Sequence, residues 1–306
     1  QKPNYRIESP FFRGLILAKL PSEKNSETPS FPTIIQHNTS ETVKKRAKVA
    51  ESMANPKICV SLEETTVKAM VDEAARAGIQ GADMVEVRFD RLYLKKPQAT
   101  ITEDDEGNRV STMPPVEEWP VKDFEELDVD KSIADLKEAI GLPVVFSVRS
   151  VRDGGHFSGT EKQRIEILQA AVVSEVKWID LEMSIKPKDR KALVESAKAA
   201  KCQIIASQHD TSGTPSSEEI VTLITSSADS GDVIKFCSTV KDHQDALQIV
   251  HAANTLTDQD ETPPYTLMAL GNGGDWGRLH APTLGQEMVY ATMRDEFRLS
   301  DKGLVK

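Results

Sequence analysis

The 306-residue sequence lacks long hydrophobic runs and an excess of basic residues. No stretch approaches the roughly 20 consecutive apolar residues that a membrane-spanning helix needs. The 48 Asp and Glu residues outnumber the 38 Lys and Arg residues, and the formal net charge is −10. On average, such a chain repels the phosphate backbone of nucleic acids. We therefore expect no membrane contact and no direct nucleic acid binding, and we expect a small molecule as the partner.

Cysteine is scarce as well. The three cysteines, Cys59, Cys202 and Cys237, lie at or inside apolar, strand-like runs. None has the close spacing of a metal-binding pair such as Cys-x-x-Cys. We interpret them as buried thiols of a protein in the cytoplasm or another reducing intracellular compartment, and we predict no metal site.

From residue 57 onward, the pattern alternates between short apolar runs and segments with helical spacing. About eight strands, nearly every one followed by a helix, are typical of an α/β protein with a TIM (β/α)8 barrel. A doubly wound open sheet is the second choice, but no Gly-x-Gly-x-x-Gly turn follows the first strand. The expected strands are 57–62, 84–90, 143–149, 177–182, 202–207, 232–237, 265–270 and 288–292, and the expected helices are 65–78, 133–140, 161–173, 186–200, 216–230, 241–254 and 281–286.

Three regions depart from this alternation. Residues 1–55 are rich in Ser, Pro, Lys, Glu and Asn, and we interpret them as an N-terminal extension or linker to a barrel domain at 56–306. The polar stretch around 95–130 is too long for an ordinary connection and is expected to be a solvated insertion. After the last strand, residues 294–306 are too short and polar to supply the eighth helix, which is therefore predicted to be missing.

One lysine, Lys235, lies in the middle of the apolar run 232–237. A buried lysine must either pair with a carboxylate or lose its proton, because burial disfavours the charged form. A deprotonated lysine in a dry pocket is a nucleophile for ketones. The alternative is an edge strand whose lysine extends to water, but a closed barrel has no edge strand.

Other charged side chains are also expected to point into the barrel. Strand alternation places Glu86 and Arg88 on one face, and Asp180 and Glu182 share a face in a later strand. Internal ion pairs would satisfy part of this charge, with Glu86–Arg88 and Asp180–Arg149 as the natural pairs. Polar residues at the carboxyl ends of barrel strands also mark the active site of this architecture.

A histidine and two glycine-rich loops complete the predicted mouth of the barrel. His209 follows the fifth strand, one strand–helix unit before Lys235, and is well placed to shuttle protons. The segments 149–155 and 271–278 contain glycines that let the backbone approach a ligand, although neither has the Gly-Lys-Ser/Thr ending of a P-loop. Arg278 offers a planar fork that suits a carboxylate.

Taken in order, several motifs resemble the type I 3-dehydroquinate dehydratase (dehydroquinase) family over about residues 57–292. They are Val85-Glu86-Val87-Arg88-Phe89-Asp90, Phe146-Ser147-Val148-Arg149 with Gly154-Gly155, Ile179-Asp180-Leu181-Glu182, Ser207-Gln208-His209-Asp210 and Ile234-Lys235. The resemblance implies a TIM barrel without a metal or an organic cofactor. It also implies a lyase that dehydrates 3-dehydroquinate to 3-dehydroshikimate in the shikimate or quinate pathway.

The resemblance implies roles for particular residues. Lys235 would form an imine with the C3 ketone, and His209 would remove the C2 proton and help the C1 hydroxyl leave as water. Asp153 stands where the family commonly has Glu before Gly-Gly, so the carboxylate is one methylene shorter. Ser300 would be the serine of the closing lid, although the usual glutamine is not evident. The residues implied to bind substrate are Glu86, Arg88 and Arg149 for the ring hydroxyls and for charge around the imine, Arg278 for the carboxylate, and Ser300.

The altered lid and the long extension leave a second hypothesis, a non-enzymatic sensor similar to the dehydroquinase-like part of a quinate-pathway regulator. A class I aldolase, which also uses an imine-forming lysine, is a third hypothesis. The His-Asp pair after the fifth strand and the lack of an obvious phosphate cradle argue against it. The sequence leaves open a homodimer and a place within a multidomain polypeptide.

Overall fold

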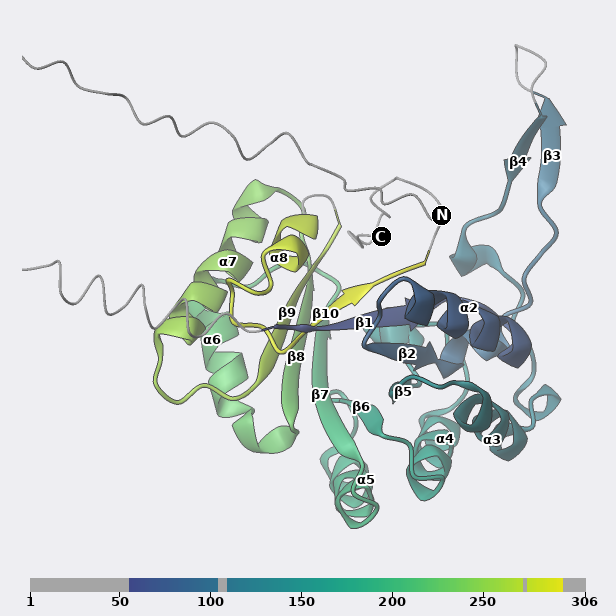
Figure 1. The fold of residues 1–306 in the computed structure, drawn as a ribbon, viewed down its shortest axis with the longest axis horizontal. Coiled ribbons are helices and arrows are strands. Elements are labelled where there is room, and N and C mark those ends of the chain that lie inside the picture. Colours follow the sequence, from purple (N-terminus) through teal and green to yellow (C-terminus); the bar gives the residue numbers. More distant parts are fainter. Residues whose placement is uncertain (1–54, 104–108, 272–273, 294–306) are drawn as a thin grey trace, which may run out of the picture. The chain divides into compact units, whose positions relative to one another are not determined.

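The computed structural model describes residues 55–103, 109–271 and 274–293. Eight parallel strands form one sheet in the order β10-β1-β2-β5-β6-β7-β8-β9. They are β1 (Lys57–Leu62), β2 (Met84–Arg88), β5 (Val144–Ser147), β6 (Trp178–Glu182), β7 (Gln203–Asp210), β8 (Val233–Thr239), β9 (Tyr265–Leu270) and β10 (Met288–Ala291). The sheet curls into a nearly closed TIM barrel, which confirms the predicted fold class (Figure 1).

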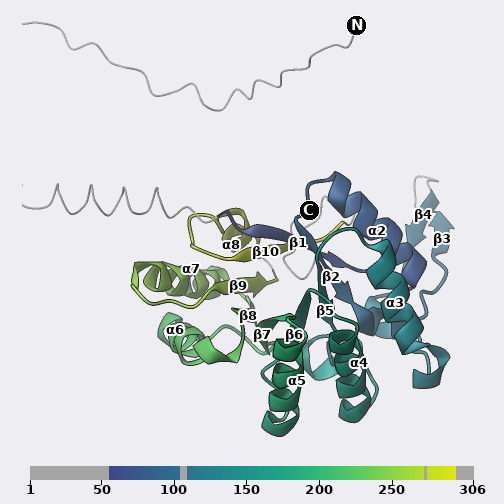
Figure 2. The same cartoon turned by 60° about the horizontal axis from the view of Figure 1, so that its bottom comes forward.

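Helices lie outside the strands and connect them (Figures 1 and 2). Polar residues cap most of their first turns; for example, Thr160 and Ser216 form capping boxes with Gln163 and Glu219. No helix in the described ranges is long and apolar enough to cross a membrane. The helices are α2 (Val67–Ile79), α3 (Val129–Ala139), α4 (Glu161–Val173), α5 (Pro187–Ala199), α6 (Ser217–Ser226), α7 (His243–Asp258) and α8 (Asp275–Leu279).

The barrel closes at the seam between β9 and β10. The Glu287 amide donates to the Tyr265 carbonyl at 2.9 Å. The side chains of Gln286 and Thr266 add two bonds across the seam. The Leu267 amide donates to Gln286 Oε1 at 3.1 Å, and Thr266 Oγ1 donates to the Met288 carbonyl at 3.1 Å. Side chains therefore replace part of the backbone ladder at this point.

Alternation along the strands separates two apolar layers. In β8, Ile234 and Phe236 pack outward against the cluster that includes residues of α6 and α7. Val233 and Cys237 belong to a separate cluster with residues from the inner faces of other strands. Lys235 lies between these two residues on the inward face of a strand that pairs with β7 and β9, so the edge-strand alternative does not apply. All three cysteines are buried free thiols.

Some predicted element boundaries were wrong. The expected helix at 281–286 is instead α8 at Asp275–Leu279, and turns follow it. Strand β5 ends at Ser147, so Arg149 lies in the loop beyond it. Helix α3 starts at Val129, four residues before the predicted 133, because the Asp128 carboxylate accepts a bond from the Lys131 amide and caps it there.

The insertion around 95–130 has structure of its own. The antiparallel pair β3 (Thr100–Glu103) and β4 (Arg109–Thr112) is followed by the 3₁₀ turns η3 (Val116–Glu118) and η4 (Phe124–Glu126). The N-terminal extension through residue 54 and the lid serine Ser300 lie outside the described residues. So do residues 294–306, on which the prediction of a missing eighth helix rests.

Candidate active site

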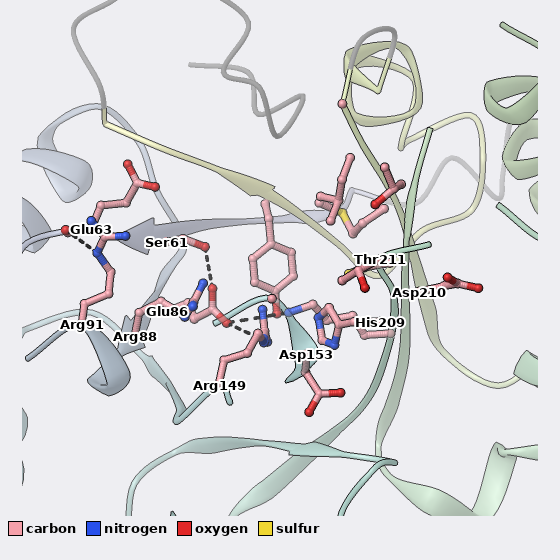
Figure 3. A pocket seen from close by; sticks show the side chains of 18 of the residues that line it. Ser61, Glu63, Glu86, Arg88, Arg91, Arg149, Asp153, His209, Asp210 and Thr211 are labelled. Atoms are coloured by element: carbon pink, nitrogen blue, oxygen red, sulfur yellow. Dashed lines mark hydrogen bonds and ion pairs between the residues drawn. The ribbon is translucent and has the colours of Figure 1, made fainter. Parts of the chain in front are cut away.

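A cavity of about 310 Å³ lies at the carboxyl ends of the barrel strands. This volume is at the lower end of the range for small-molecule sites. Six of the predicted site residues line it, and Figure 3 labels five of them: Glu86, Arg88, Arg149, Asp153 and His209, with Lys235 as the sixth. The structure thus brings together most of the predicted site.

Lys235 is 2% exposed and pairs with two carboxylates. Its Nζ lies 3.1 Å from Asp180 Oδ2 and 3.7 Å from Glu86 Oε1. Burial by itself lowers the pKa of Lys235, but Asp180 and Glu86 outweigh burial, so the pKa is raised. The buried lysine is therefore paired with carboxylates and is an ammonium ion.

Arg149 is the second cation of this network. Its Nη2 lies 3.0 Å from Asp180 Oδ2 and 3.5 Å from Glu86 Oε1, and its Nε lies 3.3 Å from Glu182 Oε1. The predicted Asp180–Arg149 pair is therefore confirmed. Lys235 and Arg149 therefore share the carboxylates of Asp180 and Glu86.

The predicted Glu86–Arg88 pair is wrong. Strand β2 ends at Arg88, and the chain turns into the 3₁₀ helix η2 (Phe89–Tyr93), which brings Asp90 back beside Arg88. Arg88 Nη2 and Nε donate to the two Asp90 oxygens at 2.7 and 3.0 Å. Asp90 also accepts bonds from the backbone amides of Arg149 and His156, so it joins η2 to the loop after β5.

Both carboxylates beside Lys235 are held ionised. Burial raises the pKa of Glu86 and of Asp180, but the Lys235 and Arg149 cations outweigh it, so both pKa values are lowered. Ser61 Oγ donates to Glu86 Oε2 at 2.6 Å, and Ser207 Oγ donates to Asp180 Oδ1. These bonds fix the carboxylate orientations around the ammonium.

His209 differs from these paired groups. It lies near the end of β7, opposite Cys237 in the register with β8. Within the described part of the chain, neither of its ring nitrogens has a hydrogen-bond partner. Burial lowers the pKa of His209 well below 6.5, and the Arg149 and Lys235 cations lower it further. The imidazole is therefore neutral and has a free lone pair that can accept a proton.

Asp153 lies on the wall of the cavity in the loop after β5. Its Oδ2 accepts bonds from Ser150 Oγ at 2.7 Å and Ser184 Oγ at 2.9 Å, and Arg152 Nη2 lies 3.2 Å away. The backbone requires glycine at the two positions after Asp153. Gly154 has a φ of 76°, and a Cβ at Gly155 would lie 2.2 Å from the Arg149 carbonyl oxygen.

Arg278 is not among the residues that line the cavity. It is 5% exposed, and its Nη1 and Nη2 donate to the carbonyls of Tyr290 and Ala269, both at 3.1 Å. Burial lowers the pKa of Arg278 to about 10. Its Nη1 also contacts Met268 Sδ at 3.6 Å, and both Met268 and Tyr290 line the cavity. The guanidinium thus lies one layer behind the wall, and its substrate-binding role stays a prediction.

Sequence reasoning missed two partners of Lys235. Asp180 was expected to pair with Arg149 but not with the lysine, although its alternation with Ile179 and Leu181 indicated an inward position. Tyr290 lies with its ring centroid 4.0 Å from Lys235 Nζ. Its only signal was its place two residues after Met288 in the last strand, which gives it the same inward face.

Sequence reasoning also missed the contact between Arg164 and Glu182, which is itself a partner of Arg149. Arg164, on α4, donates to Glu182 and bonds to Glu161, with Nη2 2.7 Å from Glu161 Oε1. Burial raises the pKa of Glu182 to about 7, although both Arg149 and Arg164 lower it. Over the described ranges, no group of three or more His, Cys, Asp or Glu side chains is arranged to hold a metal ion.

The fold and the site define a (β/α)8 barrel with an ion-paired lysine and an unpaired histidine at its mouth. The chain belongs to the type I 3-dehydroquinase family, whose model matches residues 58–306. It is 28% identical over 239 residues to the 3-dehydroquinate dehydratase of Methanothermobacter thermautotrophicus, covering 78% of this chain and 88% of that relative.

Other similarities agree with this assignment. The chain is 26% identical to the bifunctional 3-dehydroquinate dehydratase/shikimate dehydrogenase of Arabidopsis thaliana, over 80% of this chain and 34% of that relative. The fold matches the solved type I 3-dehydroquinate dehydratase of Clostridium difficile with a TM-score of 0.67 and 20% identity, over 82% of this chain and 89% of that one. The Clostridium difficile structure and this chain share the barrel fold.

Proposed function

We propose that this chain is a 3-dehydroquinate dehydratase, a lyase that forms 3-dehydroshikimate in the shikimate or quinate pathway through an imine on Lys235. Membership of the type I 3-dehydroquinase family supports the reaction. The observation that carries the mechanism is the position of Lys235 in the cavity, paired with Asp180 and close to the unpaired imidazole of His209.

Imine formation first requires Lys235 to lose a proton, since an ammonium is not a nucleophile. His209 is the proposed acceptor, because it is neutral and both its ring nitrogens are unpaired within the described residues. The amine then adds to the C3 carbonyl. The carbonyl oxygen takes one proton from the nitrogen and one from the His209 imidazolium and leaves as water, which returns His209 to its neutral form. The Asp180 and Glu86 carboxylates remain beside the new iminium nitrogen and stabilise its positive charge.

The iminium withdraws electrons from the neighbouring carbon and acidifies its hydrogen. His209 removes the C2 proton, and the electron pair moves toward the nitrogen to give an enamine. The imidazolium then protonates the C1 hydroxyl, which leaves as water while the electrons return. Hydrolysis of the imine releases the product and restores Lys235.

The remaining roles are proposals for substrate orientation. Glu86, Arg88 and Arg149 line the cavity and are proposed to hold the ring hydroxyls. Asp153 is proposed to assist proton transfer from the loop after β5. Arg278 is the proposed carboxylate ligand; its contacts with two wall residues place it near the cavity. Ser300 is the proposed lid serine.

The test is borohydride reduction in the presence of 3-dehydroquinate, followed by peptide mass spectrometry, together with a continuous assay of the conjugated enone product. We expect turnover and a reduced adduct on Lys235. Lys191→Ala serves as a control, because Lys191 lies on the outer helix α5 and is exposed. Turnover without an adduct on Lys235 would contradict the imine mechanism, and an adduct without turnover would favour the sensor.

Assembly and location are separate proposals. The Arabidopsis relative joins a dehydratase to a shikimate dehydrogenase in one chain, which supports a place for this chain in a multidomain polypeptide. A homodimer is the other proposal, and sedimentation velocity of the full chain distinguishes a dimer from a monomer. The buried free thiols support a reducing intracellular compartment.

A further inference from the structure

Tyr290 is a buried polar residue in the cavity that the mechanism above does not use. It lies on β10, is 3% exposed and lines the same cavity as Lys235 and His209. Its ring centroid is 4.0 Å from Lys235 Nζ. In the part of the chain that the structure describes, its hydroxyl is buried and has no hydrogen-bond partner. An unpaired buried hydroxyl costs stability, and the Tyr290 hydroxyl is therefore available as a donor to a ligand bound beside Lys235.

Two other buried tyrosines show why the location matters. The Tyr265 hydroxyl donates to the Leu284 carbonyl at 2.6 Å and is a satisfied structural group. The Tyr93 hydroxyl also lacks a partner among the described residues, but its ring packs against Phe124 and Phe157 and does not line the cavity. Among the tyrosines that the structure describes, only Tyr290 combines an unpaired hydroxyl with a place beside the reactive lysine.

The phenol of Tyr290 is a hydrogen-bond donor at any working pH. Burial raises its pKa well above 10, and the nearby Cys59, Glu86 and Asp180 raise it further. The aromatic face beside Lys235 Nζ favours a cation, whether an ammonium or an iminium. The side chain therefore offers two distinct interactions to a ligand attached at Lys235.

We propose that Tyr290 is a further catalytic residue, whose hydroxyl donates a hydrogen bond to the substrate oxygen at the carbon that Lys235 attacks and whose ring stabilises the iminium. This inference rests on the proposed function. As the C–N bond forms, the carbonyl π electrons move onto the oxygen, and the Tyr290 hydroxyl stabilises the growing negative charge. The C–O bond then breaks, and the oxygen departs as water with two of the three ammonium protons. The third proton stays on the iminium nitrogen beside the ring.

The two interactions can be separated by substitution. Tyr290→Phe keeps the ring and removes the hydroxyl, whereas Tyr290→Leu removes both. The rate of imine formation is measured directly by quenching single-turnover reactions with borohydride and following the adduct on Lys235. For Tyr290→Phe we expect this rate to fall roughly 10²-fold, the scale for the loss of one donor to a developing oxyanion. For Tyr290→Leu we expect a further fall of about 2- to 30-fold from the lost cation–π contact.

Thermal unfolding distinguishes this role from a structural one. Tyr290→Phe removes an unpaired buried hydroxyl, so its Tm is expected to equal or exceed that of the wild type. The matched control is Tyr265→Phe, which removes a paired hydroxyl outside the cavity. Its Tm is expected to fall while its trapping rate stays at the wild-type value.

The outcomes distinguish a failure of the proposed function from a failure of the role proposed for Tyr290. A wild-type chain that forms no adduct on Lys235 overturns the proposed function and this role with it. A wild-type chain that forms the adduct at the same rate as Tyr290→Phe overturns the role of the Tyr290 hydroxyl alone. A slower Tyr290→Phe with an equal or higher Tm supports it.

Discussion

The cavity has two sides that differ in how their polar groups are satisfied. The ionic side consists of Glu86, Arg149 and Lys235, which line the cavity, together with Asp180, which does not line it but pairs with Lys235 and Arg149; each of these charges has at least one partner within 3.7 Å. The open side consists of His209, which Figure 3 labels, and Tyr290; their side-chain polar atoms have no hydrogen-bond partner within the described residues. The charges of the ionic side pair with one another, whereas the side chains of the open side can pair with a ligand.

This difference predicts different costs for substitution. Removing one member of a buried ion pair leaves an uncompensated charge, which costs about 3–5 kcal/mol of unfolding free energy. Removing an unpaired polar group from the open side costs little stability, because no bond is lost. Substitutions on the open side should therefore reduce activity with little loss of stability, whereas substitutions on the ionic side should reduce stability.

The largest expected effect belongs to Lys235, which is needed both for activity and for stability. Lys235→Ala removes the nucleophile, and turnover is expected to fall by roughly 10⁴- to 10⁶-fold, the scale for loss of a covalent catalyst. The variant should also unfold more easily than wild type, since Asp180 and Glu86 lose a cation. The enone assay and urea unfolding measure the two changes. Turnover close to the wild-type rate would show that the reaction does not pass through this lysine.

His209 should affect activity alone. His209→Gln removes the proton acceptor, and turnover is expected to fall by about 10²- to 10⁴-fold. Its unfolding free energy should stay close to the wild-type value, because the ring nitrogens have no partner to lose among the described residues. A large loss of stability in this variant would break the distinction between the two sides.

Asp180 should affect stability most. Asp180→Asn leaves Lys235 and Arg149 with one fewer anion, and we expect a loss of about 3–5 kcal/mol in urea unfolding. Glu195→Gln is the control, because this glutamate pairs with Lys191 on the exposed face of α5. That exposed pair should contribute less than about 1 kcal/mol. Equal losses in the two variants would contradict the structural importance of the ionic side.

The pH dependence tests how the two sides exchange a proton. The pKa of His209 lies well below 6.5 and that of Lys235 lies above 10.5, so one proton stays on Lys235 between these values. Its transfer to His209 within the site needs no exchange with solvent, and kcat/KM is expected to be flat from about pH 8 to 9, above the pKa of about 7 of Glu182, which pairs with Arg149.

The same measurement on His209→Gln gives the contrast. Without the acceptor, Lys235 must lose its proton to solvent, so the borohydride trapping rate should rise about tenfold per pH unit over this range. Arg88 and Arg149 stay charged throughout, and Glu86 and Asp180 are already ionised. A flat trapping rate in the variant would identify one of these two carboxylates as the proton acceptor instead.

Much of the ionic side could be predicted because strands have a fixed side-chain period. Once residues 84–88 and 233–239 are strands, Glu86 and Lys235 can only point inward, since their neighbours Val85 and Ile234 pack against the helices. Period alone does not say which inward charges meet across the barrel. The Asp180–Lys235 contact depends on strand stagger and could not be predicted from the sequence.

Predictions failed where strands end. Arg88 was paired with Glu86 on the assumption of a strand through residue 90, but η2 begins at Phe89 and turns Asp90 toward the guanidinium. Arg278 lies in α8 and donates to two backbone carbonyls, which the glycine-rich loop pattern does not indicate; its substrate-binding role stays a prediction. Tyr290 gave little signal because a tyrosine in a short apolar strand resembles an ordinary core residue.

The pairing of β10 with β1 has a consequence for how the protein folds. Strand β10 pairs with β1, and the Lys57–Glu287 ion pair joins positions 230 residues apart. Such distant pairing is slow to form, because the intervening chain must be closed into a loop. During synthesis, the strands from β1 to β9 emerge before β10 and can form only an open sheet. Lys235 thus gains its aromatic neighbour only when the last of the described strands closes the ring.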